Sequence, residues 1–347
     1  MMKILSWRSF HISILLSLLV IALSAQAFSQ SGYHVVKQIK LGGEGGWDYV
    51  AIDAKARRLY LSRSTHVMVV DADSGNVVGD IPNTPGVHGV AIVSDLGKGF
   101  TSNGRDNSVT VFELKTLKVL KQIPVGKNPD TIIYDPASKR VFTMNGASQD
   151  ATAIDPQTET VTGTIALEGR PEFAVADEAG HVFANIEDKS EIVELDTRKL
   201  AVLNRWSLAP CEEPSGLALD RKHKRLFSVC SNKQMAVMNA ESGKVVTTLP
   251  IGSGPDAAGF DSETGIAFSS NGEGTLTVVH EDSPDKFSVV ENVKTQRGAR
   301  TMAFDPKTHQ VYLVTAEFGP PPAPTPERPR PRPSIVPGTF TLLIVGK

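Results

Sequence analysis

Residues 123–155 read IPVGKNPDTIIYDPASKRVFTMNGASQDATAID, and this stretch carries the pattern that decides the fold. An apolar run ends in Asp135, a second run carries the aromatic residue Phe142, and a third run ends in Asp155. Short runs rich in Val, Ile, Thr and aromatic residues with near alternation are typical of β-strands, and Asp-Pro is typical of turns. The stretch is therefore predicted to hold three short strands joined by turns.

The same unit recurs along the chain. Its second-strand aromatic residue returns every 40 to 44 residues, at Tyr60, Phe100, Phe142, Phe183, Phe227, Phe268 and Tyr312. The first strands begin with the same spacing, at Asp48, His88, Asp130, Glu172, Ser215, Asp256 and Arg300. Four short strands per unit, repeated with this period, are the sequence pattern of a β-propeller. Seven units predict an all-β fold of seven four-stranded antiparallel blades.

The two ends of the repeat region complement each other. The seventh unit has three strands but no fourth before the chain stops. Residues 33–42, YHVVKQIKLG, resemble the fourth strand of unit two, KVLKQIPVG at residues 118–126. We therefore expect the N-terminal strand to complete blade seven and close the ring, which leaves no unpaired edge there. Residues 28–347 are predicted to form a single domain.

The first 27 residues have the pattern of a signal peptide. Lys3 and Arg8 precede an apolar run over residues 12–23, and Ala25-Gln26-Ala27 gives the small-x-small cleavage pattern. The run is shorter than the roughly 20 residues that span a bilayer. We predict cleavage of residues 1–27 and a periplasmic protein without a membrane span, with secretion as the alternative.

The charge of the remaining chain argues against nucleic acid as a partner. The full sequence has 36 Lys and Arg residues against 38 Asp and Glu residues, and the predicted cleavage removes two of the basic ones. The mature chain thus carries 34 − 38 = −4 formal charges. Sequence-independent binding to phosphates needs a basic surface, so this class is disfavoured.

The repeat units resemble a known family. Residues 123–129, 134–136, 140–145 and 153–155 look like the YVTN repeat, and the chain is similar to exported bacterial YncE-like seven-bladed propellers. Related propellers include subunits of electron-transfer enzymes, lactonases and modules that bind partners. The resemblance implies the fold but does not select among these functions.

The geometry of a propeller predicts a polar pocket at the channel mouth, the face on which the first strands begin. Loops between second and third strands lie on the same face and add Arg105, with Arg63, Asn145, Asn185, Asn232, Asn271 and Glu317. The candidate ligand-binding residues are Asp48, His88, Arg105, Asp130, Glu172, Asp256 and Arg300. Their carboxylates could chelate a divalent cation, or Arg105 and Arg300 could hold an anion. Alternatively, an acid after Pro helps to shape the start of each inner strand, and the ring of acids has no ligand.

Other motifs exclude some cofactors. No HExxH and no clustered His and Cys residues occur, so no zinc site is predicted, and the absence of CxxCH excludes covalent c-type haem. Three histidines in turns on the opposite face are expected to be solvated: His181, His223 and His309.

Cys211 and Cys230 fall near the top of one blade, which predicts a disulfide in an oxidising compartment. The alternative is a pair of thiols that binds a soft metal such as copper.

Residues 319–338, GPPPAPTPERPRPRPSIVPG, interrupt unit seven and hold 9 of the 22 prolines. Such proline density favours an extended polyproline II arm, with which Arg328, Arg330 and Arg332 could contact a partner. The alternative is a loop insertion without a role.

These observations favour an exported, non-catalytic binding module whose top face binds a small-molecule ligand or a periplasmic protein. The alternative is a metal-assisted lactonase or hydrolase at the channel mouth, in which Asp130, Glu172 and Asp256 hold a divalent cation and His88 acts as base.

Overall fold

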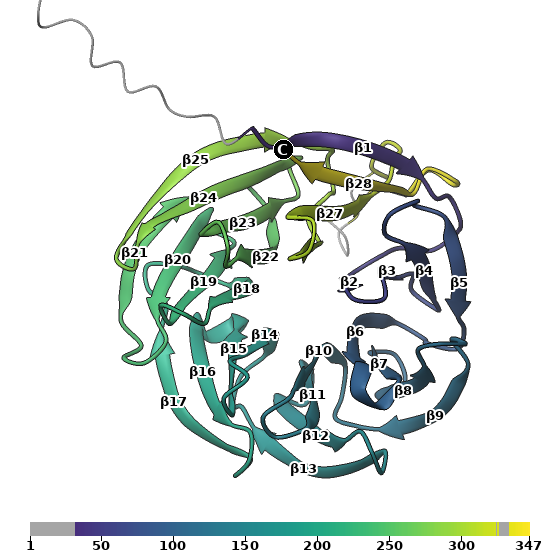
Figure 1. Cartoon of the computed structure of the whole chain (residues 1–347), viewed down its shortest axis with the longest axis horizontal. Coiled ribbons are helices and arrows are strands. Elements are labelled where there is room, and N and C mark those ends of the chain that lie inside the picture. Colours follow the sequence, from purple (N-terminus) through teal and green to yellow (C-terminus); the bar gives the residue numbers. More distant parts are fainter. Residues whose placement is uncertain (1–31, 324, 326–332) are drawn as a thin grey trace, which may run out of the picture. The chain divides into compact units, whose positions relative to one another are not determined.

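The computed structural model of the protein describes residues 32–323, 325 and 333–347. Seven four-stranded antiparallel sheets lie in a ring, which confirms the predicted seven-bladed propeller (Figure 1). The predicted signal peptide, residues 1–27, lies outside the described residues. Within the described part of the chain, no helix is long and apolar enough to cross a membrane.

The first four blades follow the chain in order. Blade one contains β2 (Val50–Asp53), β3 (Arg58–Ser62), β4 (Val67–Asp71) and β5 (Val77–Ile81). Blade two contains β6 (Val87–Val93), β7 (Lys98–Asn103), β8 (Ser108–Glu113) and β9 (Val119–Pro124). Blade three contains β10 (Pro129–Asp135), β11 (Arg140–Asn145), β12 (Asp150–Asp155) and β13 (Thr160–Ala166). Blade four contains β14 (Pro171–Ala176), β15 (His181–Ile186), β16 (Glu191–Asp196) and β17 (Ala201–Ser207).

The last three blades complete the ring. Blade five contains β18 (Pro214–Asp220), β19 (Arg225–Cys230), β20 (Gln234–Asn239) and β21 (Val245–Pro250). Blade six contains β22 (Pro255–Asp261), β23 (Ile266–Asn271), β24 (Thr275–Ser283) and β25 (Lys286–Lys294). Blade seven contains β26 (Met302–Asp305), β27 (Gln310–Thr315), β28 (Thr341–Gly346) and β1 (His34–Lys40). Two short 3-10 turns, η1 (Ser94–Leu96) and η2 (Glu187–Lys189), lie in loops.

Blade seven is closed by strands from both ends of the repeat region. β1 pairs antiparallel with β28, from His34 opposite Gly346 to Lys40 opposite Thr341. Figure 1 shows β1 beside β28 at the outer edge of the blade. The predicted closure by the N-terminal strand is therefore confirmed.

The hydrophobic core lies mainly between neighbouring blades. The second-strand aromatic residues that defined the period are at most 3% exposed in every blade. One buried cluster joins residues of blades three and four, such as Phe142, Ile165 and Val182. Each blade therefore depends on its neighbours to remove its apolar faces from water.

Repeated polar contacts tie consecutive blades together on the face opposite the channel mouth. The first residue of a second strand reaches the turn between the third and fourth strands of the next blade. Arg58 donates a hydrogen bond to the Leu114 carbonyl, and Lys98 lies 2.7 Å from the Glu159 carboxylate. Arg140 donates to the Thr197 carbonyl (2.7 Å), and Arg225 pairs with Asp285 (2.7 Å).

Several residues that the sequence places in the mouth are buried within blades instead. Asn145, Asn185 and Asn271 are 0% exposed. The Asn145 amide donates to Asp150 (2.6 Å) and to Thr152 (2.9 Å), so it joins the second strand of its blade to the third. Because their hydrogen-bonding groups are used within the fold, these three asparagines have a structural role.

Arg63 occupies the same place in blade one and is 1% exposed. Its guanidinium donates to the carbonyls of Gly42, Glu44 and Gly45, at 3.1, 2.7 and 3.1 Å, and lies 3.6 Å from the centre of the Phe340 ring. Burial lowers the pKa of Arg63 to about 10. The glycine-rich loop wraps around this cation, and Gly45 (φ 89°) has the positive φ that favours glycine.

We predict that Arg63→Ala lowers the free energy of unfolding by more than about 3 kcal/mol, because three loop carbonyls lose their donor and the buried side chain no longer packs on Phe340. Chemical denaturation measures this loss. Arg105→Ala, which removes an exposed arginine from blade two, should change the stability by less than about 0.5 kcal/mol. Equal effects of the two substitutions would contradict the role of Arg63.

The predicted disulfide is present. Cys211 and Cys230 are bonded, their Cα atoms lie 5.7 Å apart, and no cysteine is free. The bond links the segment before β18 to the end of β19 within blade five. A disulfide is typical of proteins in oxidising, exported compartments.

Replacement of Cys211 and Cys230 by serine is expected to lower the free energy of unfolding by roughly 3 kcal/mol, because the bond closes a loop of about 20 residues. The reduced wild-type protein should unfold at the same denaturant concentration as the double variant. If oxidised wild type and double variant unfolded at the same concentration, this stabilising role would be wrong.

Candidate functional site

The first strands of five blades carry a backbone irregularity where they reach the channel mouth. The pairing register shifts between Val87 and Val90, and likewise after Pro129, Pro171, Pro214 and Pro255. The residue directly after each of these positions is His88, Asp130, Glu172, Ser215 or Asp256. β-Bulges re-aim side chains next to functional sites. The repeated bulge was not visible in the sequence, although the Pro-acid pairs marked its place.

Three of the predicted residues come together from blades one, two and three. Nδ1 of His88 lies 2.5 Å from Oδ2 of Asp48 and 3.6 Å from Oδ1 of Asp130. The donor atoms of the three side chains all lie within 4.8 Å of one another. Oδ1 of Asp130 is buried and has no hydrogen-bond partner among the described residues. We call Asp48, His88 and Asp130 the mouth cluster.

The imidazole of the mouth cluster is held in one orientation. Burial disfavours its charged form, but the hydrogen bond with Asp48 and the charge of Asp130 outweigh burial, so the pKa of His88 is raised. Behind the ring, a Cβ atom on Gly104 would lie only 2.7 Å from Nε2 of His88. Glycine at this position therefore makes room for the ring.

The carboxylates of the mouth are hard to ionise together. Burial is the largest cause, and neighbouring carboxylates add to it. The pKa of Asp130 is raised to about 6, that of Asp256 to about 7 and that of Glu172 to about 9. At neutral pH the mouth thus has more acidic groups than it can stabilise as anions.

Tyr49 lies among these acids, and sequence reasoning missed it. Its hydroxyl accepts a hydrogen bond from Thr131 (3.1 Å), and its ring lies 5.4 Å from that of Phe173. Burial first, and then the charges of Asp130 and Glu172, raise the pKa of Tyr49 well above its ordinary value. The other units carry no tyrosine at this position, so the repeat gave no signal for it.

The predicted arginines lie at the rim of the mouth. Arg105 lines a hollow of about 270 Å³ together with Asp48 and His88. Nε of Arg300 lies 3.4 Å from Oδ2 of Asp256, and its side chain is 44% exposed. Arg300 thus neutralises part of the charge of Asp256, but neither arginine pairs with the mouth cluster.

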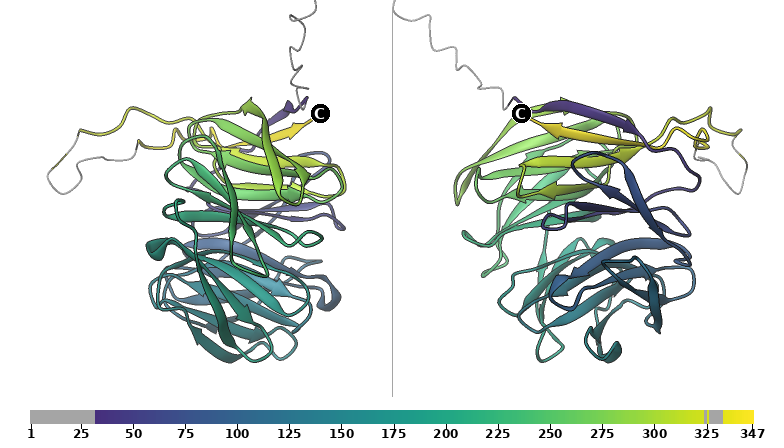
Figure 2. Two further views of the ribbon diagram at one scale, coloured as in Figure 1. Left: turned by 90° about the vertical axis from the view of Figure 1, so that its left-hand side faces the viewer. Right: turned by 45° about the vertical axis from the view of Figure 1, so that its right-hand side comes forward.

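The base of the proline-rich insertion borders the same face. Figure 2 shows the chain after β27 leaving one side of the ring. Phe318 and Ile335 form an isolated β-bridge, and with Trp47, Arg297 and Arg300 they line a hollow of about 430 Å³. Arg328, Arg330 and Arg332, the predicted partner arm, lie outside the described residues.

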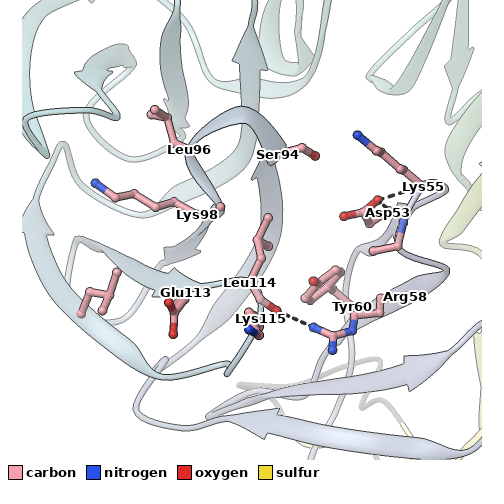
Figure 3. A pocket seen from close by; sticks show the side chains of 13 residues that line it. Asp53, Lys55, Arg58, Tyr60, Ser94, Leu96, Lys98, Glu113, Leu114 and Lys115 are labelled. Atoms are coloured by element: carbon pink, nitrogen blue, oxygen red, sulfur yellow. Dashed lines mark hydrogen bonds between the residues drawn. The ribbon is translucent and has the colours of Figure 1, made fainter.

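A larger hollow of about 770 Å³ lies on the opposite face between blades one and two (Figure 3). Three of its charged side chains already have partners in the fold. Arg58 donates to the Leu114 carbonyl, Asp53 accepts the backbone N–H of Ala56 (2.8 Å), and Lys98 pairs with Glu159. The mouth cluster, in which the donor atoms of three metal-binding side chains converge, is the better candidate site.

Comparison with known proteins shows the fold alone. Neither a protein-family model nor a curated protein matches the chain. Among solved structures, it is similar to Kuenenia stuttgartiensis hydrazine synthase, with a TM-score of 0.70 and 15% identity over 78% of this chain and 92% of that one. It is also similar to U3-55K, with a TM-score of 0.72 and 8% identity over 90% of this chain and 98% of that one. The β-propeller fold commonly serves as a protein-interaction module. The resemblance to YVTN-repeat propellers stays a prediction.

The raised pKa of Asp256 has a consequence for stability. An ordinary Asp in the unfolded chain ionises near pH 4, whereas folded Asp256 does so near pH 7. Between these values the folded state binds more protons, so stability falls as pH rises from about 4 to 7. The difference between the two pKa values corresponds to roughly 4 kcal/mol, so Asp256→Asn should raise Tm by up to about 6 °C at pH 8, with no gain at pH 4.

The control is Asp95→Asn, which neutralises an exposed carboxylate on the opposite face. Its effect on Tm should be the same at both pH values. A gain for Asp256→Asn that is independent of pH would contradict the assignment.

Proposed function

We propose that this propeller is a binding module that recognises a cationic ligand at the channel mouth, with a divalent metal ion as the simplest occupant of the mouth cluster. The observation that carries the proposal is the convergence of Asp48, His88 and Asp130 on one point, with a buried Asp130 oxygen that has no hydrogen-bond partner among the described residues.

The donor types fit a divalent cation. Two carboxylates and one imidazole combine oxygen ligands, which suit Mn²⁺ and Ca²⁺, with a nitrogen ligand, which suits Zn²⁺ and Mn²⁺. Mn²⁺ accepts both ligand types and is therefore the probe of choice. The Nδ1 atom of His88 that would bind the ion lies 2.5 Å from Asp48, so binding of a cation would replace this contact.

The electrostatics favour the same class of ligand. Burial raises the pKa of each of these carboxyl groups, and repulsion between neighbouring carboxylates adds to the effect. A bound cation relieves this repulsion, so binding should release protons at neutral pH. An anionic ligand would meet this repulsion unless it bound at the rim arginines.

Catalysis by the bound metal is the second candidate function. A cation held by three side chains keeps open positions for water or a carbonyl oxygen, as a metal-assisted hydrolase requires. His88 is a poor general base in that scheme, because Nδ1 contacts Asp48 and Nε2 faces Gly104. Metal-dependent hydrolysis of lactones or esters that is lost in Asp130→Asn would favour the enzyme over the binding module.

Calorimetric titration of chelator-treated protein with Mn²⁺ tests the proposal. Wild type should bind one equivalent at the mouth. Asp130→Asn should weaken binding by at least about 100-fold, because it removes one charged ligand of three. Elemental analysis of protein purified without chelators should find the same difference.

The matched control is Asp106→Asn, which removes one negative charge from an exposed loop on the same face. It should bind Mn²⁺ as wild type does. Equal weakening in both variants would mean that Mn²⁺ responds only to the net charge of the face, and absence of binding to wild type would refute the cation site.

A further inference from the structure

A second group of metal-binding side chains lies on the opposite face, at the junction of blades five and six. It contains Asp220 at the end of β18, His223 in the turn that follows, and Glu281 near the end of β24. Their donor atoms all lie within 4.8 Å of one another. His223, expected from the sequence to be solvated, is about one-third exposed and contacts both acids.

The contacts at this place do not satisfy all of its polar atoms. Nδ1 of His223 lies 2.8 Å from Oδ2 of Asp220 and 2.8 Å from Oε1 of Glu281. A neutral imidazole nitrogen carries at most one proton, so it can donate to only one of the two carboxylates. Oε2 of Glu281 is buried and has no hydrogen-bond partner among the described residues, although the Glu281 side chain is only 3% exposed.

Both carboxylates are placed by the fold. Asp220 accepts the backbone N–H groups of Lys222 (2.9 Å) and His223 (3.0 Å), and its side chain is 2% exposed. Burial raises the pKa of Glu281, and the nearby Asp220 adds to this effect. Two buried acids beside one imidazole therefore form an incompletely compensated site.

Blade six departs from the other blades in its third strand, which carries Glu281. β24 is 9 residues long, whereas the third strands of blades one to five have 5 or 6. The pairing with β25 shifts register between Glu281 and Ser283, and such bulges re-aim side chains. The extension thus brings Glu281 to the turn of blade five.

The first turn of blade five also differs from the equivalent turns of blades six and seven. Three residues after the buried aspartate, blades six and seven carry Thr264 and Thr308, whose hydroxyls donate to that aspartate. Blade five has His223 at this position. A side chain that only closes the turn is thus replaced by one that can bind a metal ion.

From this geometry we infer that Asp220, His223 and Glu281 form a second divalent-metal site, suited to Zn²⁺, that joins blades five and six. One imidazole and two carboxylates are a zinc ligand set, with the fourth position open to water. In tetrahedral zinc sites the ligand atoms lie about 3.4 Å apart, so the present 2.8 Å contacts need only a small outward movement. The ion would take the unpartnered Glu281 oxygen or its neighbour as a ligand.

The experiment uses Asp130→Asn as the background, so that the mouth cluster does not contribute. Chelator-treated protein is titrated with Zn²⁺ in a calorimeter, and Tm is measured with and without Zn²⁺. The background variant should bind one equivalent and gain Tm with Zn²⁺. Addition of Glu281→Gln or His223→Gln should weaken binding at least about 100-fold and abolish the gain.

The matched control is His309→Gln. His309 also lies in a first-to-second-strand turn and contacts a buried aspartate, Asp261 (2.8 Å), but the other acid that it contacts in the described part of the chain is the exposed Glu263. It should leave Zn²⁺ binding unchanged. Without metal, the Glu281→Gln variant should have a free energy of unfolding at least as high as that of its parent, because it removes a buried acid that lies beside Asp220. His223→Gln tests the same site with an independent variant.

Unchanged Zn²⁺ binding in both Glu281→Gln and His223→Gln would overturn the inference, as would absence of binding in the background protein. Loss of Mn²⁺ binding at the mouth cluster would not affect it, because the two sites lie on opposite faces and use different residues.

Discussion

Closure of the ring by β1 and β28 is the interaction on which the rest of the structure depends. Each blade buries its apolar faces only against its neighbours, so an open ring would expose one face of two blades. The closing strand also adds to the core, because Tyr33 packs edge-on against Phe268 of blade six at 5.3 Å. Only in a closed ring do the first strands converge, and the mouth cluster takes its side chains from the starts of three neighbouring blades.

The fold could be predicted from the sequence because the same pattern of strands and turns occurs in seven units of the chain. The buried aromatic residues, the blade count and the closing strand all followed from one period. The site was predicted as a set of residues on one face, but not as contacts. Whether His88 touches Asp48 or Arg105 depends on bulges and rotamers, which have no separate sequence signal. The errors have two sources: Asn145 and its equivalents in other blades are buried by hydrogen bonds within the fold, and Glu281 reaches His223 because blade six departs from the repeat.

Charge is distributed unevenly over the two faces of the propeller. On the face opposite the mouth, buried aspartates at the ends of first strands have partners, such as Arg57 beside Asp305 at 2.5 Å. There the acids accept hydrogen bonds and help to hold turns and blades. At the mouth, acids of the same repeat face one another and are costly to ionise. A protein retains such a destabilising arrangement most readily where it serves function.

The pairing of β1 with β28 also constrains how the protein folds. The partners are about 300 residues apart, from His34 to Gly346, which is a very high sequence separation for a strand pair. During synthesis β1 emerges early, whereas its partner emerges only with the last residues of the propeller. The six other blades can pair their strands locally in the meantime. The waiting strand, HVVKQIK, carries two lysines and exposes most of its residues even in the finished ring, which limits its association with other chains until β28 arrives.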